Sequence, residues 1–187
     1  SSDLMAQISA EQFVKFALDL IQDKRKQYKK VYLFGQSLGA IITTYLASQQ
    51  VADAAAITVG PLGLSKILLW IAKFGAKFDI NLSTKKPPLE AGWSYEFLNA
   101  RSVSTIFDLI ALARDNLPHI NIPLYGCYSK KDLITRNTPK ILEKGVPSQY
   151  LKIQWFNNSK HVMPLDCQAQ EVIESIGDFF LQQIQSK

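Results

Sequence analysis

The pentapeptide Gly35-Gln36-Ser37-Leu38-Gly39 constrains the fold of this chain more than any other segment. It follows a short apolar run rich in strand-forming residues, 31–34, and precedes a helical pattern over 40–50. A serine at a sharp strand-to-helix turn has a strained backbone, and side chains two residues before and after it would collide. Such a turn lifts the Ser37 hydroxyl above the sheet and directs the Leu38 N–H at a developing oxyanion. We therefore predict a nucleophilic Ser37 with Leu38 as an oxyanion donor.

The rest of the chain alternates between strand and helix patterns. Ser9 and Gln12 have the spacing of a capping box, which predicts a helix to about residue 23 or beyond. Thr138 is a good helix N-cap, followed by Pro139 as the first helical residue. Further buried strands are expected at 54–59, 122–128 and 150–156, and a final helix from about 167. This alternation predicts an α/β fold with a mostly parallel sheet, and the run 31–34 should be buried on both faces.

Residues 62–118 are too long to be an ordinary connection between a strand and a helix. Helical patterns over 64–78 and 103–116 flank an irregular stretch with proline and glycine at 81–92. We expect 62–118 to form an inserted helical cap. The core of the fold would then consist of 1–61 and 119–187.

A serine nucleophile requires a base, and the base requires an orienting carboxylate. Asp132 comes just after the strand predicted at 122–128, and His161 just after the strand at 150–156. Carboxyl ends of parallel strands share one edge of the sheet, where ligands bind, and Ser37 should lie at the same edge. We predict Asp132 as the acid and His161 as the base, with Asp166 as the alternative acid or the N-cap of the last helix.

Composition excludes several classes of protein. The chain has 187 residues, 47% of them hydrophobic and 20% charged, which indicates one soluble globular domain. The two cysteines are too few for a disulfide framework and favour a reducing compartment, so we expect a cytoplasmic protein. Two histidines and two scattered cysteines do not make a zinc site, and we expect neither metal nor cofactor. No apolar run is long enough to span a bilayer.

Two basic segments leave alternatives open. The cluster over 24–30 could bind anions, but it lacks the interleaved aromatic residues of a nucleic-acid surface, and we expect no nucleic-acid partner. The simpler interpretation is the solvated C-terminal end of a helix. The segment 64–78 combines an apolar stripe with lysines, so it is either a cap helix over an acyl pocket or a membrane-surface helix.

Several segments together resemble the α/β-hydrolases, with the bacterial carboxylesterase and monoacylglycerol lipase group as the closest likeness. The segments are Gly-Gln-Ser-Leu-Gly, a helical cap, Ile-Pro-Leu-Tyr-Gly with Lys-Asp-Leu-Ile-Thr, and Leu-Lys-Ile-Gln-Trp-Phe-Asn-Asn-Ser-Lys-His-Val-Met-Pro-Leu-Asp. The resemblance extends from about residue 10 to the end. It implies Ser37 as nucleophile, Asp132 as acid, His161 as base and Leu38 as one oxyanion donor.

One departure from that family concerns the start of the fold. In the family, other strands precede the strand before the serine turn, and a loop after one of them supplies a second oxyanion N–H. Here only about 30 residues precede that strand, and they predict one helix. The chain therefore resembles the C-terminal part of the fold. We expect the N-terminal half to come from an upstream segment or a separate chain, because an unpaired strand edge would be exposed. A minimal variant of the fold is the third and least favoured alternative.

The expected function is hydrolysis of small-molecule carboxylic esters with short to medium acyl chains, through an acyl-enzyme. Thioesterases, acyltransferases and peptidases use the same three residue types. A weak or inactive binding module on this scaffold is the other alternative, since half of the oxyanion site is not visible in the sequence.

Overall fold

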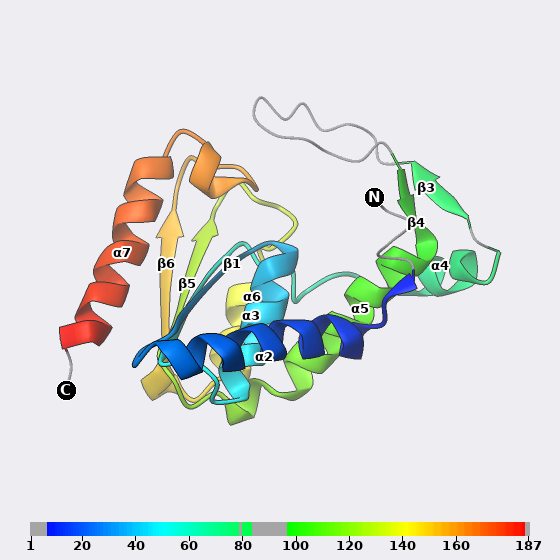
Figure 1. The fold of residues 1–187 in the computed structure, drawn as a ribbon. Coiled ribbons are helices and arrows are strands. Elements are labelled where there is room, and N and C mark those ends of the chain that lie inside the picture. The colour runs from blue at the N-terminus through cyan, green and yellow to red at the C-terminus, as the bar shows by residue number, and fades with distance from the viewer. Residues whose placement is uncertain (1–6, 79, 84–96, 186–187) are drawn as a thin grey trace.

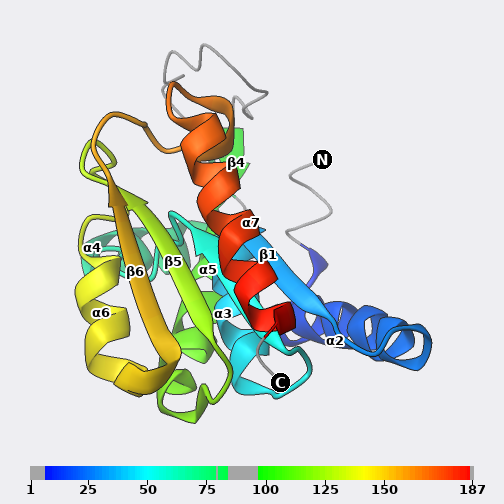
Figure 2. The ribbon, with the colours of Figure 1, turned by 90° about the vertical axis from the view of Figure 1, so that its left-hand side faces the viewer.

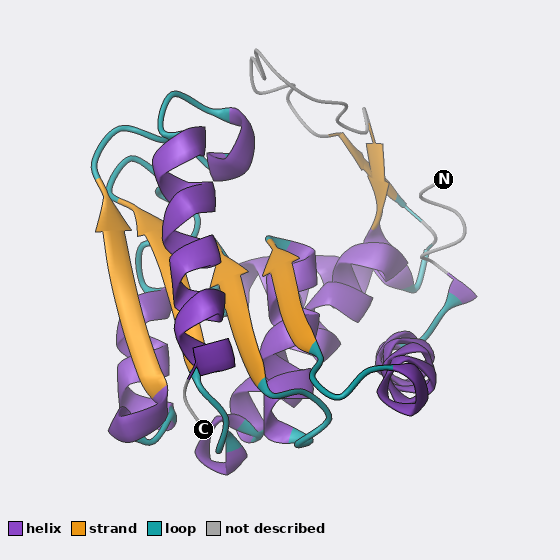
Figure 3. Ribbon diagram, turned by 60° about the vertical axis from the view of Figure 1, so that its left-hand side comes forward, coloured by secondary structure: helices purple, strands orange, loops and turns teal. Residues whose placement is uncertain are grey.

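The structure is a computed structural model that describes residues 7–78, 80–83 and 97–185. Its main sheet has four parallel strands in the spatial order β1-β2-β5-β6. Figure 3 shows these strands with their carboxyl ends at one edge of the sheet. The strands are β1 (Tyr32–Gln36), β2 (Ala54–Thr58), β5 (Leu124–Ser129) and β6 (Leu151–Phe156). The parallel sheet with flanking helices confirms the α/β class predicted from the sequence.

Helices cover both faces of this sheet (Figures 1 and 2). One face carries α3 (Leu38–Ser48) and α6 (Thr138–Gly145), and the other carries α7 (Ala169–Gln185). Ala55 and Ile57 of β2 belong to the core with α3 and α6, whereas its Ala54 and Ala56 belong to the core with α7. Successive side chains of a strand point to opposite faces, so a strand covered on both sides must be continuously apolar.

The strand β1 is less buried than its sequence predicts. Within the described part of the chain it pairs with β2 on one side only, and the Phe34 side chain is 50% exposed. The expectation of burial on both faces is therefore wrong for the described residues, because β1 lies at the margin of the sheet, where α7 packs on Tyr32 but leaves Phe34 exposed. The helix α2 (Ala10–Gln27) lies beyond β1 (Figure 2), and it begins with the predicted capping box of Ser9 and Gln12.

The described residues within 62–118 form two α-helices and a small second sheet. The helices are α4 (Lys66–Ala76) and α5 (Ala100–Asp115), and the sheet pairs β3 (Asn81–Ser83) with β4 (Phe97–Asn99) in antiparallel fashion. The sequence predicted an irregular stretch over 81–92, but 81–83 form a strand, and 84–92 lie outside the described residues. A strand of three residues is too short to show a periodic pattern, which is why it was missed.

The helix α4 presents an apolar face to solvent. Ala72 and Gly75 lie on its buried side, and Gly75 packs closely against Ala100 at the start of α5. Ile67, Trp70 and Phe74 lie on the opposite side and are 72%, 69% and 53% exposed. No helix of the described residues is both long and apolar enough to cross a bilayer.

The start of α6 differs from the expectation by one residue. Thr138 is the first helical residue, and Asn137 is the N-cap. The Thr138 hydroxyl accepts a hydrogen bond from the Leu62 N–H at 3.1 Å, so a contact distant in sequence uses the oxygen that was expected to cap the helix. The prediction of Thr138 as the N-cap is therefore wrong.

Candidate active site

Ser37 lies at the turn between β1 and α3 with a strained backbone. Its φ and ψ are 52° and −113°, in a region that residues other than glycine rarely adopt. Its N–H donates to the Thr58 carbonyl at 3.0 Å, and its own carbonyl accepts from Ala40 at 3.1 Å and Ile41 at 3.3 Å. The neighbouring strand and the first turn of α3 therefore hold the serine in this conformation.

The two glycines of the turn have different roles. A Cβ at Gly35 would lie 2.3 Å from the Gly39 carbonyl oxygen and 2.4 Å from Thr43 Oγ1, so no side chain fits there. A Cβ at Gly39 would meet no atom within 4 Å. The steric requirement expected for both glycines therefore holds for Gly35 and is wrong for Gly39, because the first turn of α3 points that position into open space.

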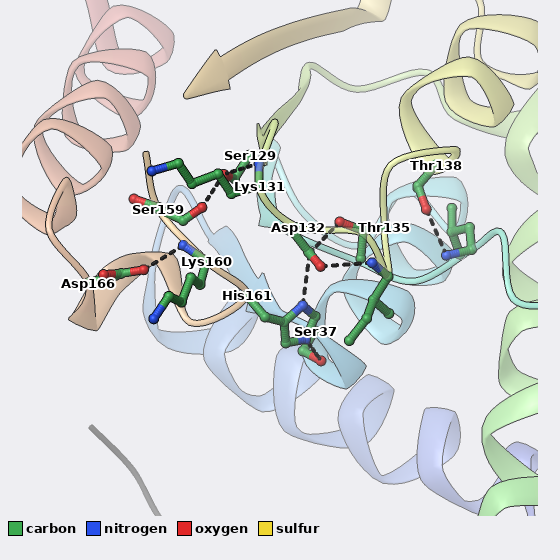
Figure 4. Close-up of polar contacts among 12 residues, drawn as sticks. Ser37, Ser129, Lys131, Asp132, Thr135, Thr138, Ser159, Lys160, His161 and Asp166 are labelled. Atoms are coloured by element: carbon green, nitrogen blue, oxygen red, sulfur yellow. Dashed lines mark hydrogen bonds and ion pairs between the residues drawn. The ribbon is translucent and has the colours of Figure 1, made fainter. Parts of the chain in front are cut away.

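The structure brings Ser37, His161 and Asp132 into one line of contacts (Figure 4). Ser37 Oγ lies 2.9 Å from His161 Nε2, and His161 Nδ1 lies 2.8 Å from Asp132 Oδ2. His161 follows β6 and Asp132 follows β5, so both side chains come from the carboxyl edge of the sheet, as the serine does. An imidazole in this position can take a proton from the hydroxyl while its other nitrogen donates to the carboxylate.

Asp132 is a buried carboxylate with several donors around it. Asp132 is 3% exposed. In addition to its contact with His161, its carboxylate accepts hydrogen bonds from Thr135 Oγ1 at 2.6 Å and from the Ile134 N–H at 3.0 Å. Burial by itself raises the pKa of Asp132, but the hydrogen bonds and the charge of a protonated His161 outweigh it and hold the pKa below its ordinary value. Asp132 therefore stays ionised near neutral pH, in contact with His161 Nδ1.

Asp166, the alternative acid, makes other contacts. Its Oδ2 accepts from the Lys160 N–H at 2.5 Å, and its Oδ1 accepts from the Cys167 N–H at 2.7 Å. These two backbone hydrogen bonds lower the pKa of Asp166. It is also not the N-cap of the last helix, which begins at Ala169. Figure 4 shows that the Asp166 carboxylate faces Lys160, away from the line of contacts at His161.

Leu38 is the first residue of α3. The first N–H groups of an α-helix have no partner inside the helix, so the Leu38 N–H is suited to an anion beside Ser37. The other histidine, His119, lies in a short 3₁₀ segment (Leu117–His119) that precedes β5, so it belongs to the amino end of that strand.

Sequence reasoning missed Thr135, which donates to the same carboxylate oxygen that His161 contacts. Its signal was present, because a hydroxyl three residues after an aspartate often closes a local turn. Ser129 and Gln168 were also missed. Their contacts join segments that the sequence separates, so no local pattern could reveal them.

The two cysteines lie outside the line of contacts from Ser37 to Asp132. Both are free thiols, with Cys127 buried inside β5 and Cys167 exposed. Burial raises the pKa of Cys127 to about 12, which keeps it a thiol near neutral pH.

No protein-family model matches the sequence. Solved structures do resemble it. A structure of the metagenome-derived lipolytic enzymes LipS and LipT aligns with a TM-score of 0.87 at 17% identity, over 97% of this chain and 77% of that one. The monoacylglycerol lipase of Paleococcus ferrophilus aligns with a TM-score of 0.79 at 17% identity, over 94% of this chain and 76% of that one.

A soluble variant of the monoglyceride lipase from Saccharomyces cerevisiae aligns with a TM-score of 0.70 at 12% identity, over 92% of this chain and 68% of that one. These neighbours are lipases of the α/β-hydrolase superfamily, and each match covers nearly all of this chain. At this level of identity the likeness concerns the backbone and not the substrate. The chain has the α/β-hydrolase fold, with a parallel sheet flanked by helices.

Proposed function

We propose that this protein is a serine hydrolase that cleaves carboxylic esters with short to medium acyl chains. The observation that carries the proposal is the continuous line from Ser37 Oγ through His161 to Asp132, with contacts of 2.9 Å and 2.8 Å. The lipases and esterases among the structural neighbours support hydrolase chemistry in general.

In the first half of the reaction, His161 Nε2 takes the proton of Ser37 Oγ as that oxygen attacks the ester carbonyl carbon. The carbonyl oxygen becomes an oxyanion, which the Leu38 N–H and the positive end of α3 stabilise. When the tetrahedral intermediate collapses, the carbon–oxygen bond to the alcohol breaks, and His161 gives its proton to the leaving oxygen. An acyl-serine and a free alcohol result.

In the second half, water attacks the acyl-serine and His161 Nε2 takes a proton from that water. Collapse of the second intermediate breaks the bond to Ser37 Oγ, which recovers the proton from His161. The products are a carboxylic acid and an alcohol, and the protein returns to its starting state. Throughout, Asp132 holds the Nδ1 proton of His161 and stabilises the imidazolium that forms.

Residues 62–118 would form a cap over the acyl chain, with 1–61 and 119–187 as the core.

The open side of β1 supports a further proposal, that another strand pairs there. Phe34 is 50% exposed on β1, and an outer strand with free backbone groups and apolar side chains is a template for pairing. That strand, from an upstream segment or a separate chain, would also bring the second oxyanion donor.

The free thiols support a reducing compartment such as the cytoplasm.

Fluorophosphonate labelling together with ester hydrolysis tests the main proposal. An activated serine reacts with the probe, so we expect mass spectrometry to find the label on Ser37, and p-nitrophenyl butyrate to be hydrolysed. Ser37→Ala should lose both, with turnover falling by about 10⁶-fold as for other triad nucleophiles. Buried Ser48→Ala is the matched control and should retain both. Labelling elsewhere, or hydrolysis that persists in Ser37→Ala, would overturn the assignment, and a folded but unlabelled protein would favour the inactive binding module.

The exposed face of α4 supports a second function, binding to an anionic lipid surface. Trp70 and Phe74 stack with ring centroids 5.9 Å apart on the solvent side. The exposed Lys73 lies in the same helix, and the exposed Lys77 is its C-cap residue. Apolar rings flanked by lysines are typical of helices that lie in a membrane interface. We expect the protein to sediment with phosphatidylglycerol vesicles, and Trp70→Ser with Phe74→Ser to abolish this. Equal recovery of both proteins in the supernatant would exclude this function.

A further inference from the structure

The segment that carries His161 has no regular secondary structure of its own. Residues 157–162 connect β6 to a short 3₁₀ segment (Met163–Leu165), outside any helix or strand. A loop without internal hydrogen bonds depends on other groups to fix its backbone. The imidazole must nevertheless keep both its contact to Ser37 and its contact to Asp132, so the loop position bears directly on the reaction.

Two side chains just beyond the loop bind its backbone at consecutive residues. Gln168 Oε1 accepts from the Asn158 N–H at 2.7 Å and from the Ser159 N–H at 3.1 Å. The next N–H, that of Lys160, donates to Asp166 Oδ2 at 2.5 Å. Every backbone N–H from Asn158 to Lys160, immediately before His161, is therefore held by a side chain.

A third side chain joins this loop to the segment that carries Asp132. Ser129 Oγ, at the end of β5, donates to the Ser159 carbonyl and accepts from the Lys131 N–H at 3.2 Å. Ser129 and Ser159 are 1% and 0% exposed, so water does not compete for this hydrogen bond. Figure 4 shows Ser129 between Ser159 and Lys131, beside Asp132.

A neighbouring carboxylate orients the amide of Gln168. Its Nε2 donates to Glu171 Oε2 at 2.9 Å, which leaves Oε1 to face the loop. Gln168 Oε1 therefore accepts from two backbone N–H groups, while Glu171 of α7 fixes the orientation of the Gln168 amide.

We propose that Gln168, anchored by Glu171, is a positioning residue that holds the backbone of residues 158–160 and so places the His161 imidazole between Ser37 and Asp132. Ser129 and Asp166 complete the same restraint. This inference rests on the proposed function for its kinetic readout. Catalytic groups need placement within fractions of an ångström, and a displacement of about 1 Å can lower the rate by about 10²-fold.

The test compares three variants at residues 168–171, around the start of α7. Gln168→Leu removes the acceptor, and we expect kcat to fall by about 10- to 100-fold with KM nearly unchanged. Gln170→Leu is the matched control, since Gln170 lies two residues away and its Nε2 donates to Glu174 Oε1 at 2.9 Å without touching the loop. The double swap Gln168→Glu with Glu171→Gln restores an acceptor facing the loop and a donor that anchors it, and it should recover most of the lost kcat.

A spectroscopic readout separates this inference from the proposed function. The Nδ1 proton of an imidazole bound to a buried carboxylate gives a low-field NMR resonance that is independent of turnover. We expect this resonance in the wild type, Gln170→Leu and the double swap, and its loss or broadening in Gln168→Leu. A wild type that shows the resonance without hydrolysing esters would overturn the proposed function alone.

Equal kcat and equal resonance in Gln168→Leu and Gln170→Leu would overturn the positioning role. If Gln168→Leu fails to fold, Ser129→Ala replaces it, with the buried hydroxyl variant Ser48→Ala as its control, since Ser48 Oγ donates to the Tyr45 carbonyl within its own helix. The expected and contradicting results are the same for that pair.

Discussion

Ser37 Oγ and His161 Nε2 lie 2.9 Å apart although 124 residues separate them in the chain. Both residues follow the carboxyl end of a strand, Ser37 after β1 and His161 after β6, at opposite sides of the same sheet. The loop after β6 must therefore reach back across two strands to bring the imidazole to the serine. Asp132, from the loop after β5, meets the other nitrogen of the ring on the way.

Asp132→Asn should reduce turnover far more than Asp166→Asn. Asparagine next to His161 Nδ1 favours the wrong tautomer of the ring, a change that lowers kcat by about 10⁴-fold in a serine protease. Asp166 accepts from the backbone N–H groups of Lys160 and Cys167 and does not contact His161, and the amide oxygen of asparagine retains one acceptor there. We expect Asp166→Asn to lose less than about 10-fold. Steady-state kinetics on p-nitrophenyl butyrate compares the two, and the reverse order would make Asp166 the acid.

Asp132 should also make stability depend on pH in the acid range. Its pKa is lower in the folded protein than in the unfolded chain, so folding favours the ionised form. This stabilisation is present above the unfolded-state pKa, about 4 for an aspartate, and is lost as the pH falls through the lower folded-state value. Urea unfolding should show a stability gap between wild type and Asp132→Asn at pH 7 that narrows below about pH 4.

The matched control for the acid dependence is Asp108→Asn, on the exposed side of α5. We expect its stability to follow that of the wild type at every pH. A gap between wild type and Asp132→Asn that stays constant on acidification would show that Asp132 has the same pKa in the folded and unfolded protein.

Gly35→Ala and Gly39→Ala should have opposite outcomes. The new methyl group at Gly35 would overlap the Gly39 carbonyl at 2.3 Å, and overpacking of this kind destabilises by about 1–3 kcal/mol or more. A methyl group at Gly39 meets no atom within 4 Å, and alanine in a helix is favoured over glycine by up to about 1 kcal/mol. Thermal unfolding measures both, and similar losses of stability would show that the turn needs both glycines for another reason.

Residues 1–187 in isolation should self-associate through β1. The strand has Phe34 exposed and an open backbone side among the described residues, which invites pairing with a second copy. Light scattering should report a mass above that of a monomer, and Phe34→Lys should lower it because a lysine on an edge strand opposes pairing. Phe16→Lys is the control, because Phe16 of α2 is 75% exposed and its replacement tests whether removing any exposed aromatic side chain lowers the mass. A monomeric wild type, or an equal effect of both lysines, would contradict the pairing.

The order of the elements could be predicted from local pattern. Three features depend only on residues that are close together in the sequence: the capping box at Ser9, the strand at 54–58 and the turn at Ser37. The three-residue strands β3 and β4 carried no such pattern, and the start of α6 was misplaced because the Thr138 hydroxyl bonds to Leu62, far away in the chain.

The sequence alone determined that the chain alternates strands and helices, and that Ser37, Asp132 and His161 follow the ends of strands. Short apolar runs, helical periodicity and glycine at a tight turn are local properties, so they can be read from neighbouring residues. Only the tertiary structure decided that Asp132 and not Asp166 contacts His161, that Gly39 has open space beside it, and that Gln168 holds the loop before the histidine. Each of these depends on distances between residues whose relative position is set by strand order and loop path, and a linear pattern contains no such distances.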